Sequence, residues 1–351
     1  MHLYARWLAE ALRDFAIVTR YEAPAVFFTR MSSLSGSQRY FFYLDQFVLL
    51  PLILLFWQTK FDVIIVADHS NAPCAFLVSS KKLIVMVHDT IAIRGALGMI
   101  PEYDRNVGSL GKLLQRLIVR ALKRASAVFA NPGPLRQELR DLGIKAHIEV
   151  VGCPLDIARL TARPARQPSS LSSSDKFALY VGSDIARKRK RALVDIWRSG
   201  PLRDGPYDLV LAGFTDNDNR KLFEQLVPGR IRFVNDASED ELRWLYEHCS
   251  FFITASAHEG FCIPVLEASY FRKCVITPDS PFFKEVFGEN VKAVLRFDGR
   301  DDKRILDTIE QFDPSRSDLS RTQLLATYSY PEFAGRVCRT VDCIAAQRSA
   351  T

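Results

Sequence analysis

Short, uninterrupted apolar runs alternate with amphipathic segments along most of this chain. In the first half these runs are Val63–Val66, Leu83–Val87, Ala127–Ala130 and Ile148–Val151. The second half repeats the pattern at Phe177–Val181, Asp208–Gly213, Ile231–Val234, Phe251–Thr254 and Cys274–Thr277. β-Branched runs without polar interruption are typical of strands covered on both faces. The pattern therefore predicts two doubly wound α/β units with parallel sheets, which bind ligands at the carboxyl ends of their strands.

The polar segments between these runs suggest where the domains end. Residues 161–174 are rich in Pro, Ser, Arg and Ala, have little to bury, and are predicted to be a linker. We therefore expect one domain at 1–160, a second at 175–328, and a closing helix within 329–351. A chain of 351 residues suits two cores of this kind.

The longest apolar run, Phe47–Trp57, is eleven residues long and is interrupted by Pro51. A helix needs about 20 apolar residues to span a bilayer. The run is therefore predicted to be a buried helix, with a segment that dips into a membrane as the alternative.

Charge is distributed unevenly between the two halves. Residues 1–160 carry 19 Lys and Arg against 13 Asp and Glu, which accounts for +6 of the net charge of +7. Five basic residues recur at helical spacing opposite a leucine-rich side: Lys112, Arg116, Arg120, Lys123 and Arg124. Such a helix fits an anionic membrane surface or an ordinary solvated face, and the charge asymmetry slightly favours the membrane. The second half is nearly neutral and has no nucleic-acid motif, which argues against a nucleic-acid partner.

Cysteine usage bears on the compartment. The seven cysteines are scattered, odd in number and contain no C-x-x-C pair, which argues against both a zinc site and a disulfide framework. The first residues do not read as a signal peptide. A cytoplasmic location is therefore expected, peripheral on the inner membrane face if the basic helix binds lipid.

The most specific motif surrounds Glu259 and Glu267, eight residues apart after a predicted strand. Pro264 is typical of the first residues of a helix. The amides of residues 260–262 then lead into a positive helix N-terminus, which favours phosphate or sugar hydroxyls. Two acids beside such a seat indicate a phosphorylated, hydroxyl-rich ligand such as a nucleotide-sugar. The alternative is an ordinary helix start with two solvated acids.

In single letters the motif reads S-x-x-E-G-F-x-x-P-x-L-E-A, starting at Ser256. It resembles the signature of the retaining, nucleotide-sugar-dependent glycosyltransferases of family 4, which have the GT-B fold of two Rossmann-like domains facing a cleft. The likeness covers almost the whole chain, including Val87–Asp89 and Leu179–Lys188. Family members begin with a strand and a glycine-rich loop before the helix that here includes Tyr4. We therefore expect either that this strand is missing or that the start was set too far downstream.

The resemblance implies transfer of a sugar from a nucleoside diphosphate with retention of configuration. It implies catalytic roles for Glu259, His88 and Lys188. The donor-binding residues that it implies are Gly182, Ser183, Arg187, Lys188, Gly260, Phe261, Cys262 and Glu267. Glu267 would bind the ribose hydroxyls. Because many members have arginine where this chain has Ser183, Arg187 or Arg189 would substitute, or the diphosphate would be held more weakly.

The family's diphosphate seat consists of basic groups and amides, and the chain has no Asp-x-Asp motif. The resemblance therefore implies neither a metal nor another cofactor. Loose similarity to bacterial O-antigen mannosyltransferases suggests GDP-mannose as donor and a glycan or lipid-linked acceptor in cell-surface polysaccharide synthesis. Two alternatives stay open: a non-catalytic relative that binds nucleotide or glycan, and a GT-B nucleotide-sugar epimerase.

Overall fold

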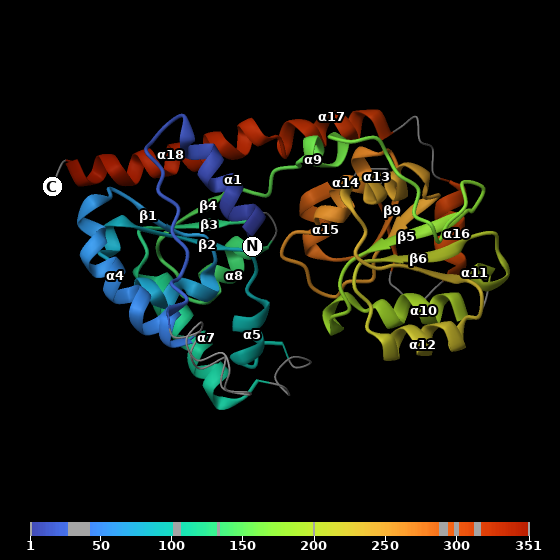
Figure 1. The fold of residues 1–351 in the computed structure, drawn as a ribbon, viewed down its shortest axis with the longest axis horizontal. Helices are drawn as coiled ribbons and strands as arrows, with labels where there is room; N and C mark the ends of the chain where they lie inside the picture. The colour runs from blue at the N-terminus through green and yellow to red at the C-terminus, as the bar shows by residue number, and fades with distance from the viewer. Residues whose placement is uncertain are drawn as a thin grey trace. The chain divides into compact units, whose positions relative to one another are not determined.

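The computed structural model describes residues 2–26, 43–100, 107–131, 134–198, 201–287, 294–297, 302–311 and 317–349. The chain forms two compact units (Figure 1). Unit 1 contains Met1–Pro154 and Tyr330–Thr351, and unit 2 contains Leu155–Ser329. Each unit has a parallel sheet with helices, which confirms the predicted α/β class.

The sheet of unit 1 has four parallel strands in the order β1-β2-β3-β4. They are β1 (Ile64–Val66), β2 (Leu83–Val87), β3 (Ala127–Ala130) and β4 (His147–Val150). Every residue of β2 and β3 is buried, as expected for strands covered on both faces. The apolar runs of the sequence therefore predicted these strands correctly.

The helices of unit 1 come from both ends of the chain. They are α1 (His2–Arg13), α4 (Leu50–Trp57), α5 (Ile91–Ala96), α7 (Ser109–Arg124), α8 (Leu135–Asp141) and α18 (Tyr330–Ser349). The last helix packs beside the first, as Figure 1 shows. The Cys338 thiol donates to the Ala11 carbonyl at 3.2 Å, and Arg336 Nη1 donates to the Val150 carbonyl at 3.0 Å.

The sheet of unit 2 has six parallel strands in the order β10-β9-β8-β5-β6-β7. They are β5 (Phe177–Val181), β6 (Asp208–Ala212), β7 (Ile231–Val234), β8 (Phe251–Ile253), β9 (Cys274–Pro278) and β10 (Val294–Phe297). The strand order reverses at β5, which lies between β6 and β8. Ligands bind at such a switch point in open α/β sheets. The loops that follow β5 and β8 are therefore adjacent.

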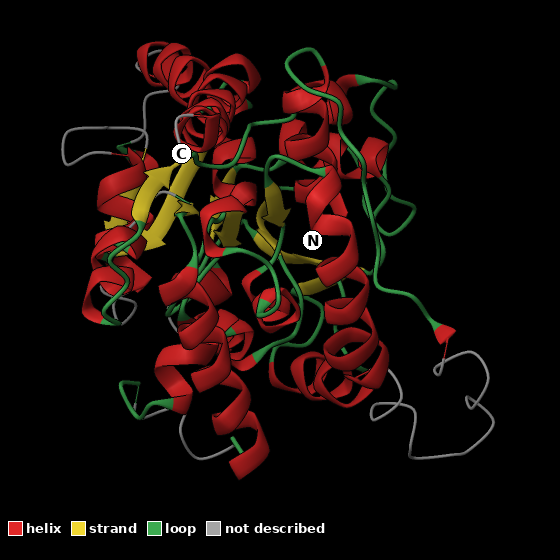
Figure 2. Cartoon of the chain, turned by 90° about the vertical axis from the view of Figure 1, so that its left-hand side faces the viewer, coloured by secondary structure: helices red, strands yellow, loops and turns green. Residues whose placement is uncertain are grey.

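Helices form two cores with this second sheet. Figure 2 shows the helices of the chain in red and its strands in yellow. Those of unit 2 are α9 (Ile157–Thr161), α10 (Lys190–Arg198), α11 (Pro201–Asp204), α12 (Asn217–Leu226), α13 (Glu239–His248), α14 (Ile263–Tyr270), α15 (Pro281–Phe287), α16 (Asp302–Glu310) and α17 (Ser317–Thr327). Phe177 and Leu179 of β5 pack into one core with Leu266 of α14. Tyr180 packs into the other core with Trp197 of α10.

Residues 161–174, predicted to be a linker, belong to unit 2. Leu171 is buried in the core on the α14 side of the sheet. Arg166 Nε donates to Asp240 Oδ2 at 2.9 Å, which attaches the segment to α13. These contacts give the segment a fixed path along unit 2.

The prediction of a buried helix at Phe47–Trp57 is wrong. The segment is helical, but within α4 only Leu50 and Pro51 are buried, and Phe56 is 73% exposed. The helix packs on one side against the 3₁₀ segment His69–Ala75. Its other side carries apolar residues that face away from the core.

Candidate functional site

The site begins where β5 ends, at Gly182. The Gly182 N–H donates to the Ala212 carbonyl at 2.9 Å, which holds the turn against the end of β6. A Cβ atom at this position would lie 2.7 Å from the Tyr180 hydroxyl, so the turn needs glycine. The Ala257 N–H donates to the Arg187 carbonyl at 2.9 Å. The loops after β5 and β8 are thus tied together directly.

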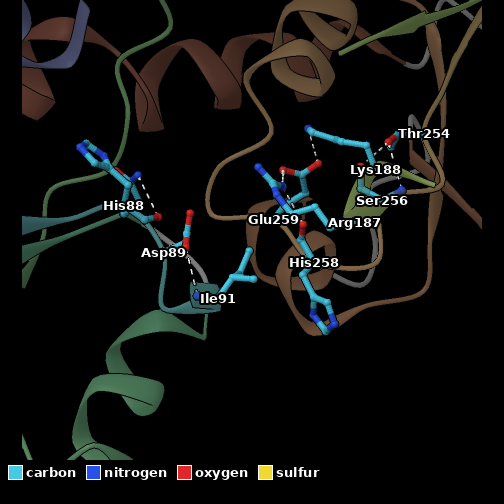
Figure 3. A network of polar contacts seen from close by, with 10 residues as sticks. His88, Asp89, Ile91, Arg187, Lys188, Thr254, Ser256, His258 and Glu259 are labelled. Carbon is cyan, nitrogen blue, oxygen red and sulfur yellow. Dashed lines mark hydrogen bonds and ion pairs between the residues drawn. The ribbon is translucent and has the colours of Figure 1, made fainter. Parts of the chain in front are cut away.

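Glu259 lies on the loop after β8 and receives two cationic side chains from the loop after β5 (Figure 3). Lys188 Nζ is 2.5 Å from Glu259 Oε1, and Arg187 Nη1 is 2.9 Å from Glu259 Oε2. Arg187 Nη1 also donates to the His258 carbonyl at 2.9 Å. The Glu259 side chain is 4% exposed. Three groups predicted from the sequence therefore meet in one partly buried ion cluster.

The electrostatics of the cluster keep Glu259 ionised. Burial alone would raise the pKa of its carboxyl group. The charge and hydrogen bond of Lys188, with contributions from Ser256 and Arg187, outweigh that effect and lower the pKa below its ordinary value of 4.5. Glu259 is therefore a carboxylate at neutral pH.

Glu267 is the fifth residue of α14, one turn into the helix. Arg159 Nη2 is 2.5 Å from Glu267 Oε1, and the Tyr246 hydroxyl donates to Glu267 Oε2 at 2.7 Å. The residue is only 3% exposed, which contradicts the alternative of a helix start with two solvated acids. Each carboxylate oxygen has two acceptor sites, so these bonds leave acceptor capacity for a ligand hydroxyl.

Burial has the larger effect on Glu267 and raises its pKa, although Arg159 and Tyr246 oppose the shift. Arg159 is shared with Glu239, to which it also forms an ion pair. Nothing in the sequence motifs indicates Arg159 or Tyr246 as partners of Glu267. Arg159 is 108 residues from Glu267 in the chain, and no local pattern connects them.

The amides between the two acids precede α14. Within the described ranges, the structure gives the N–H groups of Gly260 and Phe261 no protein acceptor. Pro264 lies in the first turn of the helix that follows. These N–H groups and the helix dipole make the turn suitable for an anion. Cys262 is buried, and burial raises the pKa of its thiol to about 12, so the thiol is a poor nucleophile.

Ser183 and the remaining basic residues of the loop after β5 do not contact Glu259 in the way that Arg187 and Lys188 do. Ser183 and Arg189 are exposed, and Arg189 has a left-handed backbone with φ of 49°. Of the two arginines considered as substitutes, Arg187 therefore lies at Glu259. Lys190 is 2% exposed and donates to the Phe214 carbonyl and the Thr215 hydroxyl, each at 2.9 Å.

His88 and Asp89 follow β2 in unit 1. His88 Nε2 is 3.0 Å from the Ala67 carbonyl, and its ring contacts Tyr4 edge to face at 4.8 Å between centroids. Burial lowers the pKa of His88, although Asp68 opposes the shift, so the ring is neutral. A neutral ring that donates from Nε2 has its lone pair on Nδ1. Asp89 Oδ1 accepts from the Ile91 N–H at 3.0 Å, at the start of α5.

The basic helix predicted from the charge pattern is α7. Arg116, Arg120, Lys123 and Arg124 are exposed. Arg124 also donates to the Phe76 carbonyl at 2.5 Å. In the described part of the chain, no three His, Cys, Asp or Glu side chains are grouped as a metal site requires.

Comparison with known proteins identifies both halves of the chain. Residues 2–159 match the family described as Glycosyltransferase Family 4, and residues 162–321 match Glycosyl transferases group 1. Over 187 residues the chain is 25% identical to a GDP-mannose:cellobiosyl-diphosphopolyprenol alpha-mannosyltransferase of Xanthomonas oryzae pv. oryzae, covering 52% of this chain and 47% of the relative. It is 28% identical over 118 residues to the Escherichia coli O-antigen chain mannosyltransferase B, covering 32% and 31%. The matched regions thus span about half of the first relative and about a third of the second.

Solved structures share the fold at low sequence identity. A structure of Anabaena HepE in complex with UDP and glucose has a TM-score of 0.66 at 18% identity, covering 85% of this chain and 82% of that one. Sucrose-phosphate synthase from Thermosynechococcus elongatus has a TM-score of 0.65 at 14% identity, covering 99% and 91%. The chain has the GT-B fold and belongs to the group 1, family 4 glycosyltransferases.

Proposed function

We propose that this protein is a retaining glycosyltransferase that moves a hexose from a nucleoside diphosphate to a glycan or lipid-linked acceptor. The observation that supports this most strongly is the cluster in which Lys188 and Arg187 hold Glu259 beside the turn at Gly260. The two cations and the N–H groups of the turn are suited to bind the oxygens of a diphosphate. In this proposal the carboxylate would face the sugar attached to that diphosphate.

In this proposal, Lys188 and Arg187 break their ion pairs with Glu259 when the donor binds and form ion pairs with its diphosphate instead. As the bond from C1 to oxygen breaks, negative charge grows on the leaving diphosphate, and prepositioned donors stabilise it. Hydrogen bonds to charged groups contribute roughly 1.5–3 kcal/mol each. Two or three of them would supply several powers of ten in rate, since about 1.36 kcal/mol is a factor of ten.

Glu259 would then hydrogen-bond a hydroxyl of the donor sugar or balance charge near C1. Glu267 would accept from the ribose hydroxyls with the oxygen lone pairs that Arg159 and Tyr246 leave available. Its pKa is raised by burial, so a hydroxyl donor that favours the carboxylate form would lower it again on binding. His88 would contact the donor sugar from unit 1, accepting at Nδ1.

Mannose from GDP-mannose is the proposed donor, supported by the names of the two bacterial relatives. The diphosphopolyprenol in the first of these names supports a lipid-linked acceptor. We propose a cytoplasmic enzyme that binds the inner membrane face through α7, using Lys112, Arg116, Arg120, Lys123 and Arg124. The proposal includes no metal, so turnover should be the same with and without EDTA.

Thermal unfolding with GDP, UDP and ADP tests the nucleotide part. A ligand at 100 times its dissociation constant stabilises by about 2.7 kcal/mol, and GDP should give the largest shift. Incubation with GDP-mannose and a glycan acceptor then tests transfer, and NMR of the product gives the anomeric configuration. Nucleotide binding without any turnover would favour a non-catalytic relative. Conversion of the donor in the absence of acceptor would favour an epimerase.

A further inference from the structure

An exposed apolar stripe runs along the helical segment that ends in α4. Within this segment Phe56 is 73% exposed, Val48 is 52% exposed and Leu52 is 46% exposed. We call the stripe the α4 surface, and its residues are Leu44, Val48, Leu52, Leu55, Phe56 and Trp57. Leu44, Val48, Leu52 and Leu55 recur every three or four residues, which places them on one side of the helix. Phe56 follows four residues after Leu52 and widens that side, and Trp57 is the C-terminal residue of α4. Contiguous exposed apolar surface of this kind marks a binding surface.

A second segment adds apolar residues at the end of this stripe. The Tyr21 ring contacts Trp57 edge to face, with 5.1 Å between ring centroids. Tyr21 is itself 43% exposed, and Ile17, four residues earlier, is 99% exposed. Tyr21 therefore adds exposed apolar surface from a second part of the chain at this helix end.

Basic residues border the C-terminal end of the α4 surface. Lys60 Nζ lies 6.0 Å from the centroid of the Trp57 ring. Gln58 Nε2 donates to the Leu77 carbonyl at 3.1 Å, and Arg124 of α7 donates to the Phe76 carbonyl at 2.5 Å. The segment at 76–77 thus connects the end of α4 to the basic end of α7. Lys81 is exposed a few residues further on.

The chemistry of this region identifies the partner. Apolar side chains with a cationic border match the acyl chains and anionic headgroups of a bilayer. Tryptophan and tyrosine at the border are typical of the headgroup level. Among the described helices, none is long and apolar enough to cross a membrane. We infer that the α4 surface inserts shallowly into an anionic lipid bilayer, with Phe56 and Leu52 entering the acyl region.

This inference extends the proposed membrane contact of α7 to an apolar anchor, and it does not depend on the sugar chemistry. Trp57 provides a direct readout. It is 36% exposed, whereas Trp7, Trp197 and Trp244 are each at most 6% exposed, and the chain has 4 tryptophans. Vesicles of phosphatidylcholine and phosphatidylglycerol with brominated acyl chains should therefore quench the fluorescence of Trp57. The Trp57→Phe variant should lose most of that quenching. Equal quenching in this variant would overturn the inference.

The apolar anchor is tested by the double variant Leu52→Ser/Phe56→Ser. Vesicle partitioning should fall by about tenfold or more for each side chain removed. The matched control is Leu222→Ser/Leu325→Ser, which removes two exposed apolar residues of unit 2 and should partition like the wild type. Pure phosphatidylcholine vesicles should bind more weakly than anionic ones.

Nucleotide thermal shifts, measured on the same variants, separate this inference from the proposed function. The Leu52→Ser/Phe56→Ser variant should keep the shift of the wild type, which also shows that it is folded. Light scattering tests whether a second copy of this chain, instead of a bilayer, covers the α4 surface. If the wild type is a dimer that does not bind vesicles, and the double variant is a monomer, the α4 surface joins two copies and the inference is wrong.

Discussion

Glu259 and Glu267 belong to one motif and both are shielded from water, yet their carboxyl groups have opposite pKa shifts. Glu259 has two cationic partners, and its pKa is lowered. Glu267 has Arg159, which it shares with Glu239, and the neutral Tyr246, and its pKa is raised. The difference shows that burial alone does not set the charge of these acids. Lys188 and Arg187 outweigh the effect of burial on the pKa of Glu259, whereas Arg159 and Tyr246 do not outweigh the deeper burial of Glu267.

This comparison assigns different tasks to the two sites. The cations at Glu259 come from the loop after β5, which is partly exposed, so a ligand can compete for them. The partners of Glu267 come from α9 and α13, which pack against each other. We therefore interpret the first site as one that exchanges partners and the second as one that stays fixed.

The largest expected effect is on catalysis at the first site. Replacing Lys188 by alanine should lower kcat by about 10²–10³, the usual cost of removing one prepositioned donor to a developing anion. Steady-state transfer assays would measure the loss. Arg191→Ala removes a nearby basic residue that pairs with Asp195 on the surface, and it should behave like the wild type. Equal losses in the two variants would contradict a specific role for Lys188.

The next effect concerns stability at the second site. Replacing Arg159 by alanine leaves Glu267 buried without a cation, and removal of one partner of a buried pair costs about 3–5 kcal/mol. We expect the lower end of that range, because the Arg159 side chain is 22% exposed and Glu267 can take up a proton instead. Urea unfolding measures the loss. Glu239→Ala removes the more exposed partner of Arg159 and should cost under about 1 kcal/mol.

The opposite pKa shifts predict opposite pH dependences. The lowered pKa of Glu259 gives stability that is present above its ordinary value of 4.5 and is lost as pH falls through the folded value. The raised pKa of Glu267 gives stability that is present below 4.5 and is lost as pH rises through the folded value. Glu259→Gln should therefore cost most above 4.5, and Glu267→Gln should cost least there. Urea unfolding of both variants from pH 4 to 7 would show whether the two trends differ in sign.

The smallest effect concerns Cys262, which lies between the two acids. Because burial raises the pKa of its thiol to about 12, iodoacetamide at pH 8 should leave it unmodified in the folded protein. Cys343 is exposed and should react, which makes it the internal control. Mass spectrometry of peptides would measure both. Rapid labelling of Cys262 would show that the turn opens readily.

Much of the fold could be predicted because strands that are buried on both faces have continuous apolar runs in the sequence. Phe177–Val181 and Ala127–Ala130 are strands with the predicted bounds. The exposure of α4 could not be predicted, since composition alone does not say which side of an apolar helix is covered. Its neighbours in the folded unit decide that.

The part of the candidate site that lies within local sequence motifs could also be predicted. The motif that starts at Ser256 indicates Glu259 and the turn between β8 and α14, and the separate resemblance of Leu179–Lys188 to the family indicates Lys188. Neither contains information about Arg159, which reaches Glu267 across 108 residues. Nothing in the run of basic residues at 187–191 distinguishes Lys190 from its neighbours. Arg189 has a left-handed backbone and precedes α10. Lys190, the first residue of α10, is buried, whereas Arg189 and Arg191 on either side of it are exposed.

The central claim is that Lys188 and Arg187 now hold Glu259 and would transfer to the donor diphosphate. Titration calorimetry with GDP on the wild type, Lys188→Ala and Glu259→Gln tests it most directly. We predict weaker binding for Lys188→Ala, because a cation is lost, and binding at least as tight as wild type for Glu259→Gln, because a competing carboxylate is removed. GDP binding that is unchanged in Lys188→Ala, or weakened as much in Glu259→Gln, would contradict the account.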